Sequence, residues 1–398
     1  MTSLLKSESA ENALLGSRPL HAPVMDENET LSAALDQCGP EIRDAIQAAL
    51  AGQQLSFDDA LSLANVEGPA LDALVAAANV LRRHTVGDTI SYVVNRNINF
   101  TNVCFVGCSF CGFGKGPGAP DAYSLSLEEV VAKARDAWEK GATEVCIQGG
   151  LPRDLEGFFY RDLLRAVKRA LPQMHVHAFS PMEISYGVDK TRMPLRDYLQ
   201  MMKDEGLGSI PGTAAEILDD RIRRQLSPNK LPAARWVEII TAAHELGIPS
   251  TSTMMYGHVE TPEDVVDHWD FIRDLQDEHG GFTAFVPWSF KPGNTLLEKW
   301  IKTYKGPNAY LRMLAVARLY LDNFDHIQAS WFSEGKRAGQ IALHFGADDW
   351  GGTLFEENVH KAAEYVNTIS VDEIVTLIRE AGFTPAQRTT EYEILRTY

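Results

Sequence analysis

The stretch Asn99–Lys115 reads NFTNVCFVGCSFCGFGK and carries three of the chain's five cysteines, Cys104, Cys108 and Cys111. Their spacing, C-x3-C-x2-C on a glycine-punctuated segment, lets three thiolates ligate one iron–sulfur cube. Electron-transfer clusters take four cysteines, so three leave one iron without a protein ligand, as in metal sites that stay open for catalysis. The segment therefore predicts a [4Fe-4S] cluster with one iron free to bind a chelating small molecule.

Two other metal sites compete with this interpretation. A zinc knuckle needs a fourth Cys or His close by, and residues 113–123 contain neither. A ferredoxin-type site needs a fourth cysteine, and Cys38 and Cys146 lie far from the segment in sequence. Three thiols without any metal are the remaining alternative. We favour the open cluster, because a zinc or ferredoxin site lacks its fourth ligand.

The composition limits the class of protein. The chain has 398 residues, 45% of them hydrophobic, and a net charge of −17. This length suits one large α/β barrel with an appendage, or two ordinary domains, with enough apolar residues for a core. The acidic balance argues against a nucleic-acid or anionic-membrane partner. Because there is no membrane-spanning run, no signal segment and an odd number of cysteines, we expect a cytoplasmic protein.

Four segments are expected along the chain. Residues 1–28 are polar and unpatterned, which predicts a disordered tail, and residues 29–88 have helical periodicity, which predicts a small N-terminal helical cap. Residues 89–350 are expected to form the barrel, and residues 351–398 a C-terminal helical extension packed on it. A capping box formed by Ser126 and Glu129 marks the first helix of the barrel.

The barrel prediction depends on short apolar or β-branched runs that alternate with long amphipathic stretches. The eight expected strands are Ile90–Phe100, Glu144–Gln148, His175–Phe179, Gly208–Ile210, Ser250–Tyr256, Thr283–Phe290, Ile327–Trp331 and Ala342–Phe345. Eight βα units close into a (β/α)8 barrel of the TIM type, whose active site lies at the C-terminal ends of the strands. A split barrel of six units with a separate C-terminal piece is the alternative.

The cysteine spacing is the signature of the radical S-adenosylmethionine (SAM) enzymes, and the chain resembles them. Phe110 matches the aromatic residue usually found before the last cysteine. The resemblance implies that Cys104, Cys108 and Cys111 hold a [4Fe-4S] cluster whose open iron binds S-adenosylmethionine. It also implies that a flavodoxin or ferredoxin supplies the electron, and that a 5′-deoxyadenosyl radical acts on a small-molecule substrate.

Residues that follow the second, third and fifth expected strands are candidates for the SAM site. Gln148 and Gly149 open a Gly-Gly turn that lets backbone approach a ligand, and the resemblance implies a contact with the SAM amino group. An ordinary βα turn is equally compatible. Ser180 and Glu183 could bind the ribose hydroxyls, although a carboxylate at a helix start is also explained by the helix dipole. Met255 lies in a segment that resembles the adenine-covering motif of the family.

Three residues are candidates for the catalytic base. His258 and Glu260 could form a proton-transfer pair, because histidine titrates near neutrality. A turn histidine beside a helix-capping glutamate is the alternative. Asp348 follows the last expected strand, where an acidic residue could equally be solvated.

Nearly all of residues 89–398 resemble one branch of radical SAM enzymes, which acts in menaquinone and deazaflavin synthesis. The segments NRNINFTNVC, EVCIQGG, HVHAFSPMEI, SIPGTAAEIL and STSTMMYGHVET are similar to the deazaflavin members. From Phe282 onward, FTAFVPWSFKPGNT, ARLYLDN, HIQASW, LHFGADD, EENV and PAQRTT are similar to the menaquinone members. We expect the aromatic and basic loop 286–295 to contact the substrate, and therefore give the second group more weight.

The resemblance then implies a radical SAM enzyme that cyclises dehypoxanthine futalosine in the futalosine route to menaquinone. The alternative is transfer of a 4-hydroxybenzyl group from L-tyrosine to 5-amino-6-(D-ribitylamino)uracil in the synthesis of FO and coenzyme F420. Aminofutalosine synthesis and non-catalytic electron transfer by an iron–sulfur protein are lesser alternatives.

Overall fold

The computed structural model of the chain describes residues 29–301, 305–356 and 358–398. The tail predicted for residues 1–28 lies outside the described residues. The strands, in chain order, are β1 Thr89–Val93, β2 Asn95–Ile98, β3 Glu144–Ile147, β4 His175–Ala178, β5 Ser250–Tyr256, β6 Phe282–Ser289, β7 Asp349–Gly352, β8 Thr384–Arg388 and β9 Ile394–Thr397.

The strands form three sheets, in the orders β7-β1-β8-β9, β2-β3-β4 and β5-β6, and single bridges join these sheets into one ring. β2, β3 and β4 are parallel neighbours, β5 pairs with β6, and β1 pairs with β7. Short extended segments join these sheets through single bridges. The bridged pairs are His177–Ser209, Ile210–Ser250, Phe285–Ile327, Gln328–Asp349 and Arg96–Phe355. The predicted barrel is therefore confirmed, although two of its expected strands are reduced to such bridges.

Helices cover the outside of the ring. They are α6 Leu127–Glu139, α7 Phe159–Ala170, α8 Pro181–Thr191, α9 Leu195–Asp204, α10 Asp220–Leu226, α11 Ala233–Glu245, α12 Pro262–His279, α13 Pro307–Tyr320, α14 Trp331–Glu334 and α15 Lys336–Ala342. The short η1 Leu297–Lys299 lies instead against the cysteine segment, where the N–H of Leu297 donates to the carbonyl of Ser109. The Ser126–Glu129 capping box predicted for the start of α6 is present. Thr261 and Asp264 form the same motif at the start of α12, so local capping fixes where these two helices begin.

The first expected strand is two strands, because its two halves have different neighbours. β1 lies between β7 and β8, whereas β2 pairs with β3. The strand expected at Ala342–Phe345 is wrong: this apolar run lies at and just beyond the end of α15, and the last strand of the ring is β7. A short apolar run fits a buried helix end as well as a strand, and β7 reads DWGG, which has little strand character.

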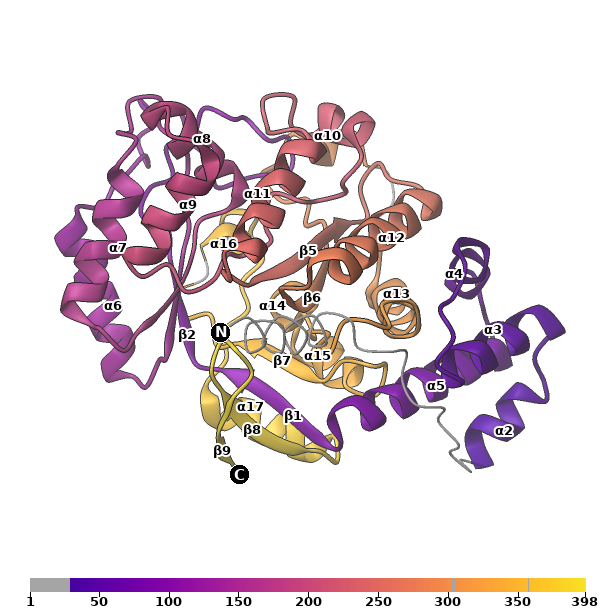
Figure 1. Cartoon of the computed structure of the whole chain (residues 1–398). Helices are drawn as coiled ribbons and strands as arrows, with labels where there is room; N and C mark the ends of the chain where they lie inside the picture. The colour runs from indigo at the N-terminus through magenta and orange to yellow at the C-terminus, as the bar shows by residue number, and fades with distance from the viewer. Residues whose placement is uncertain (1–28, 302–304, 357) are drawn as a thin grey trace, which may run out of the picture.

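The C-terminal segment 351–398 is not purely helical, contrary to the prediction. It contains α16 Val359–Ala362 and α17 Val371–Glu380, but β8 pairs in parallel with β1, and β9 pairs antiparallel with β8 (Figure 1, yellow). Pro385 within β8 hides the strand from sequence analysis, because proline lacks an N–H for a sheet ladder. Strands β8 and β9 therefore extend the sheet that contains β1 and β7.

Residues 29–86 form four helices beside the barrel, shown in indigo in Figure 1. They are α2 Glu29–Leu35, α3 Pro40–Leu50, α4 Phe57–Ala64 and α5 Pro69–Val86. α5 packs on α13, and α4 packs on α12 and α13. Among the described residues, none of the helices combines the length and the apolar character that crossing a bilayer requires.

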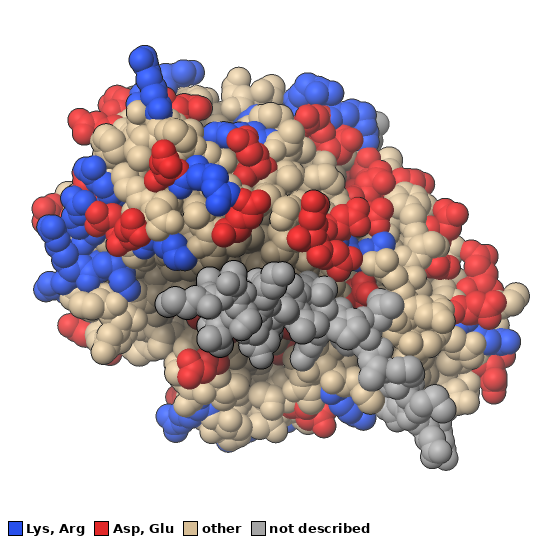
Figure 2. Space-filling view, in the orientation of Figure 1, with Lys and Arg blue, Asp and Glu red and all other residues tan. Residues whose placement is uncertain are grey.

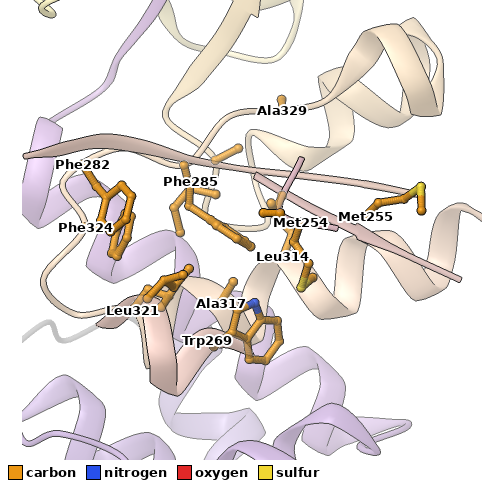
Figure 3. Packing of buried hydrophobic residues seen from close by; sticks show 14 of the residues in the cluster. Met254, Met255, Trp269, Phe282, Phe285, Leu314, Ala317, Leu321, Phe324 and Ala329 are labelled. Carbon is orange, nitrogen blue, oxygen red and sulfur yellow. The ribbon is translucent and has the colours of Figure 1, made fainter. Parts of the chain in front are cut away.

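The core on the cap side of the barrel lies between β5, β6 and the helices α12 and α13 (Figure 3). Met254 and Phe285 come from the strands, and Trp269 and Leu314 come from the helices; all four are buried. Fully burying each of these side chains contributes roughly 1.5–3 kcal/mol. Figure 2 shows that acidic side chains gather over α12 and the cap, and basic ones over α6 and α7, so this face offers no continuous basic surface to a nucleic acid.

Candidate active site

The three cysteines line a cavity of about 390 Å³ inside the barrel. Cys104, Cys108 and Cys111 form part of its wall at the C-terminal ends of the strands, and Phe110 lines it beside them. A volume in this range is typical of small-molecule sites. The position agrees with the expectation that the segment after the first strand of a (β/α)8 barrel reaches the active-site face.

Backbone hydrogen bonds hold the cysteine segment in place. The N–H of Cys104 donates to the carbonyl of Lys115 across 2.9 Å, and the N–H of Cys111 donates to the carbonyl of Cys108 across 3.2 Å. A Cβ built on Gly114 would lie 3.4 Å from Cys104 Cβ and 4.0 Å from Cys111 Sγ. These two side chains therefore face the same space over Gly114.

Three thiolates are the donor set expected for an iron–sulfur cluster with one open iron. Within the described residues, no group of three His, Cys, Asp or Glu side chains closes around a single metal ion. Burial raises the pKa of Cys108 to about 11, although the positive charge of Lys230 acts to lower it. A desolvated thiolate needs positive charge beside it, which a bound iron cluster supplies.

The Gly-Gly turn after β3 packs against the cysteine segment. Gln148 and Gly149 line the cavity, and their predicted contact with SAM stays a prediction. A Cβ on Gly149 would lie 2.5 Å from Phe100 Cζ, and a Cβ on Gly150 would overlap the carbonyl of Val103. The glycines are therefore required because the segment before Cys104 lies directly against this turn.

Ser180 and Glu183 also line the cavity, but their polar atoms are already used. They form the capping box of α8, and Glu183 Oε1 accepts a hydrogen bond of 3.0 Å from the N–H of Gly149. Burial raises the pKa of Glu183 to about 7, despite the hydrogen bonds from Ser180 and Gly149. The two residues thus have the contacts of the helix-start alternative and fix the end of β3 to the start of α8. Their contact with the cofactor ribose stays a prediction.

Met255, His258 and Glu260 do not line the cavity. His258 Nε2 lies 2.8 Å from the carbonyl of Met255, and His258 Nδ1 lies 2.9 Å from Glu260 Oε2. Glu260 also accepts hydrogen bonds from the N–H groups of Gly257 and His258. These contacts are the turn-histidine and capping-glutamate arrangement, so the structure does not bring the predicted base pair to the cavity.

Asp348 is buried outside the cavity lining. Its carboxylate pairs with Arg318 and lies 2.6 Å from His326 Nδ1. Burial alone would raise the pKa of Asp348, but His326 and Arg318 hold it below its ordinary value. The residue therefore has the contacts of a structural ion pair, and its role as a base stays a prediction.

Two charged residues that sequence analysis missed lie beside the cysteines. Lys230 Nζ is 2.6 Å from Glu216 Oε1, both residues line the cavity, and Lys230 Nζ is 5.1 Å from the centroid of the Phe110 ring. Ala214 and Glu216 have φ of 65° and 46°, a strained backbone that clusters at functional sites. The segment SIPGTAAEIL contains Glu216, but its pairing with Lys230 becomes visible only in the fold.

The cavity extends toward the N-terminal ends of the strands. Glu144, His177, Arg388, Thr390 and Tyr392 line this part. Thr390 Oγ1 donates to Glu144 Oε2 across 2.7 Å, and Arg388 Nη2 donates to Asp349 Oδ1 across 2.9 Å. Sequence analysis missed the last three because they belong to the segment that was expected to be helical.

Two protein families match the chain in succession. The radical SAM superfamily matches residues 98–272, and the CofH/MqnC C-terminal region matches residues 279–398. Among solved structures, methylornithine synthase (PylB) aligns with a TM-score of 0.68 at 19% identity over 86% of this chain and 97% of its own. The hydrogenase maturase HydG from Carboxydothermus hydrogenoformans aligns with a TM-score of 0.71 at 18% identity. This alignment covers 96% of this chain and 86% of HydG. At these identities, the two structures support the barrel fold alone.

Curated relatives are much more similar. The FO synthase of Mycobacterium leprae is 47% identical over 371 residues, which cover 90% of this chain but 43% of that protein. The 5-amino-6-(D-ribitylamino)uracil–L-tyrosine 4-hydroxyphenyl transferase of Methanopyrus kandleri is 44% identical over 363 residues, which cover 87% of this chain and 98% of that protein. The chain thus spans less than half of the FO synthase but nearly all of the transferase.

These relatives overturn the prediction of futalosine cyclisation, because their names belong to the alternative reaction. The loop 286–295, to which that prediction gave most weight, contributes only Val286 and Trp288 to the cavity. The cofactor prediction agrees with the family, which uses a [4Fe-4S] cluster and S-adenosylmethionine. The FO synthases are similar to the same part of this chain as the transferase. The chain therefore belongs, with this transferase, to the radical SAM enzymes that carry a CofH/MqnC C-terminal region.

Proposed function

We propose that the chain transfers a 4-hydroxybenzyl group from L-tyrosine to 5-amino-6-(D-ribitylamino)uracil. The observation that carries this proposal is the 44% identity to the Methanopyrus kandleri transferase over 98% of that protein's length. The FO synthases match over a comparable part of this chain, in agreement with a shared transferase portion.

Cys104, Cys108 and Cys111 would hold the cluster, and the Lys230–Glu216 pair would bind the cofactor's amino acid moiety. When bound, the cluster supplies the electron that cleaves S-adenosylmethionine into methionine and a 5′-deoxyadenosyl radical. The Lys230 ammonium suits the cofactor carboxylate and the Glu216 carboxylate suits its ammonium group, since opposite charges pair best in a buried site. A flavodoxin or ferredoxin is the class of reductant that we propose.

The remaining wall suits the two substrates. Trp288 and Phe332 offer aromatic faces for the phenol ring of tyrosine. Asn97, Thr283 and Gln328 offer amide and hydroxyl groups for a uracil and its polyol chain. Burial of both substrates among these side chains would exclude water from the radical reaction.

The proposal is tested by incubating the anaerobically reconstituted, dithionite-reduced enzyme with S-adenosylmethionine, tyrosine and the ribitylaminouracil. We expect 5′-deoxyadenosine together with a uracil adduct whose mass includes the hydroxybenzyl group. Cys108→Ser, treated identically, should form neither product. Cleavage of the cofactor without consumption of tyrosine and the uracil would overturn the proposed substrates.

A further inference from the structure

Two histidines of β4 share the hydroxyl group of one serine. His177 Nδ1 lies 2.6 Å from Ser209 Oγ, and His175 Nε2 lies 2.7 Å from the same atom. The parallel bridge between His177 and Ser209 sets the register that brings the three side chains together. The result is a continuous line of hydrogen-bonding atoms, imidazole to hydroxyl to imidazole.

The two ends of this line have different surroundings. His177 is buried and lines the cavity, and because its Nδ1 is committed to Ser209, its Nε2 is the nitrogen available to a bound molecule. His175 is the first residue of β4, at the opposite end of the strand from the cysteines, and is partly exposed. The line therefore runs from the inside of the barrel toward its N-terminal surface.

The chain makes specific room for this arrangement at Gly208. A Cβ at that position would lie 2.6 Å from His175 Cε1 and 2.7 Å from His175 Nε2. Any side chain at residue 208 would therefore displace the imidazole from Ser209. Gly208 does not have a positive φ, so its backbone conformation does not require glycine. Its lack of a side chain leaves room for the His175 imidazole.

The shared hydroxyl couples the tautomers of the two rings. A serine hydroxyl has one hydrogen, so it donates to one imidazole and accepts from the other. When Ser209 donates to His175 Nε2, His177 must carry its hydrogen on Nδ1, and His177 Nε2 presents a lone pair to the cavity. This state is ready to accept a proton from a molecule in the cavity.

We propose that His177, Ser209 and His175 form a proton relay that carries the proton lost by the substrate from the cavity to solvent. The proposal rests on the proposed transfer reaction, in which radical addition to the uracil leaves an adduct that must lose one proton and one electron. The electron leaves to an acceptor of the iron–sulfur class, and the relay handles the proton alone.

The transfer is balanced at each atom. An N–H bond of the uracil adduct breaks, its electron pair stays on the adduct, and the proton binds His177 Nε2. The proton on His177 Nδ1 passes to Ser209 Oγ, the hydroxyl proton passes to His175 Nε2, and His175 Nδ1 releases its proton to water. All three side chains end neutral. Once the product has left, His177 Nε2 gives its proton to water in the open cavity while His175 Nδ1 takes one from solvent, which restores the starting tautomers with the substrate's proton in water.

The charged groups around the relay favour neutral imidazoles. Burial lowers the pKa of His177 to about 4; Glu144 opposes this shift, and His175 and Arg388 add to it. Burial also lowers the pKa of His175. The negative charges of Glu144 and Glu391 oppose this shift, and the positive charge of Lys168 adds to it. Near neutral pH the relay therefore works by exchange of tautomers between uncharged rings.

Ser209→Ala is the direct test, because it removes the hydroxyl between the rings. Ser250→Ala is a matched control: Ser250 Oγ lies 2.9 Å from His244 Nε2, at the start of the neighbouring β5, but Ser250 does not line the cavity. We expect Ser209→Ala to cleave S-adenosylmethionine normally and to form roughly tenfold less adduct per 5′-deoxyadenosine, with a larger solvent deuterium isotope effect on adduct formation. His175→Gln and Gly208→Ala should act in the same direction, and Ser250→Ala should match the wild type.

Nitrogen-15 NMR of the histidine-labelled, cluster-loaded protein in its oxidised state gives a readout that needs no substrate. We expect His177 as the Nδ1–H tautomer in the wild type and in Ser250→Ala, and as the Nε2–H tautomer in Ser209→Ala. An Nε2–H tautomer of His177 in the wild type, or an unchanged adduct yield in Ser209→Ala, would overturn the relay. If wild-type enzyme forms no adduct, the proposed function fails, and the tautomers alone decide whether the relay exists.

Discussion

Lys230 and Glu216 form an ion pair of 2.6 Å between Nζ and Oε1 in the wall that also holds Cys108. Burial alone would lower the pKa of Lys230, but the Glu216 carboxylate raises it above its ordinary value. Lys230 therefore remains a cation inside the cavity. A fixed cation and a fixed carboxylate beside three thiols are what a zwitterionic amino acid group on an iron cluster requires.

Replacing Lys230 should therefore weaken cofactor binding. We expect Lys230→Met to raise the Kd of the cluster-loaded enzyme for S-adenosylmethionine roughly 10–100-fold, because a hydrogen bond to a charged group contributes about 1.5–3 kcal/mol. Equilibrium binding measures this shift. Lys336→Met is the control, since Lys336 Nζ is also 2.6 Å from a carboxylate, that of Glu373, but does not line the cavity. Equal affinities of Lys230→Met and wild type would contradict the assigned contact.

Each of the three cysteines should be needed for the cluster. Cys104→Ser, Cys108→Ser and Cys111→Ser are expected to lose most of the iron and the brown colour after anaerobic reconstitution, because each removes one thiolate ligand. Iron and sulfide analysis with Mössbauer spectroscopy measures this loss. Cys38→Ala, in the buried cap, should retain the full cluster. Retention of a complete cluster in any of the three serine variants would identify a different ligand.

The turn after β3 should tolerate no side chain at Gly150. A Cβ there would overlap the carbonyl of Val103, so Gly150→Ala must displace the segment that leads into Cys104. We expect a loss of stability of roughly 1–3 kcal/mol and a lower iron content. Gly118→Ala should leave both unchanged, because a Cβ at Gly118 would have no neighbour within 4 Å. Denaturant unfolding measures the stability of the two variants, and iron analysis measures their cluster content. Equal values for Gly150→Ala and Gly118→Ala would contradict the prediction.

Glu183 should make the stability of the fold depend on pH. Burial raises its pKa from 4.5 to about 7 in the folded state, so between these values the folded chain holds a proton that the unfolded chain has released. Stability of the wild type therefore falls as pH rises through this window. The free energy of unfolding of Glu183→Gln, minus that of the wild type, should increase by up to about 1.4 kcal/mol per pH unit from pH 5 to 7. A difference that does not change with pH would show that Glu183 is ionised throughout.

Asp348 should matter for stability and not for the radical reaction. Asp348→Asn leaves Arg318 without its buried partner, and breaking a buried ion pair costs roughly 3–5 kcal/mol. We expect a large drop in Tm, with the yield of adduct per 5′-deoxyadenosine unchanged below the unfolding transition. A variant of normal Tm that cleaves the cofactor but forms no adduct would instead restore Asp348 as a candidate base.

Local sequence patterns could predict the cluster segment and the barrel. The spacing of Cys104, Cys108 and Cys111 within one loop indicates the ligand set. The alternation of short apolar runs with amphipathic stretches indicates the order of strands and helices. Local patterns also gave two wrong predictions of secondary structure. Pro385 concealed β8, and the apolar run near Phe345 was compatible with both a strand and a helix end.

Contacts between distant segments could not be predicted in this way. The pairing of Lys230 with Glu216, and the presence of Arg388 and Tyr392 in the cavity, depend on the closed ring and on β8 beside β1. The substrate prediction was wrong because it gave most weight to the loop 286–295, most of which lies outside the cavity lining. Similarity over nearly the whole length of a relative carried more information than that loop.

The central claim is that this radical SAM barrel joins a tyrosine fragment to a ribitylaminouracil. A single incubation of the reduced enzyme with S-adenosylmethionine, ring-labelled carbon-13 tyrosine, the ribitylaminouracil and dehypoxanthine futalosine tests it by mass spectrometry. We predict a uracil adduct that carries the tyrosine label, with 5′-deoxyadenosine and unconsumed dehypoxanthine futalosine. Conversion of dehypoxanthine futalosine with no labelled adduct would contradict the claim.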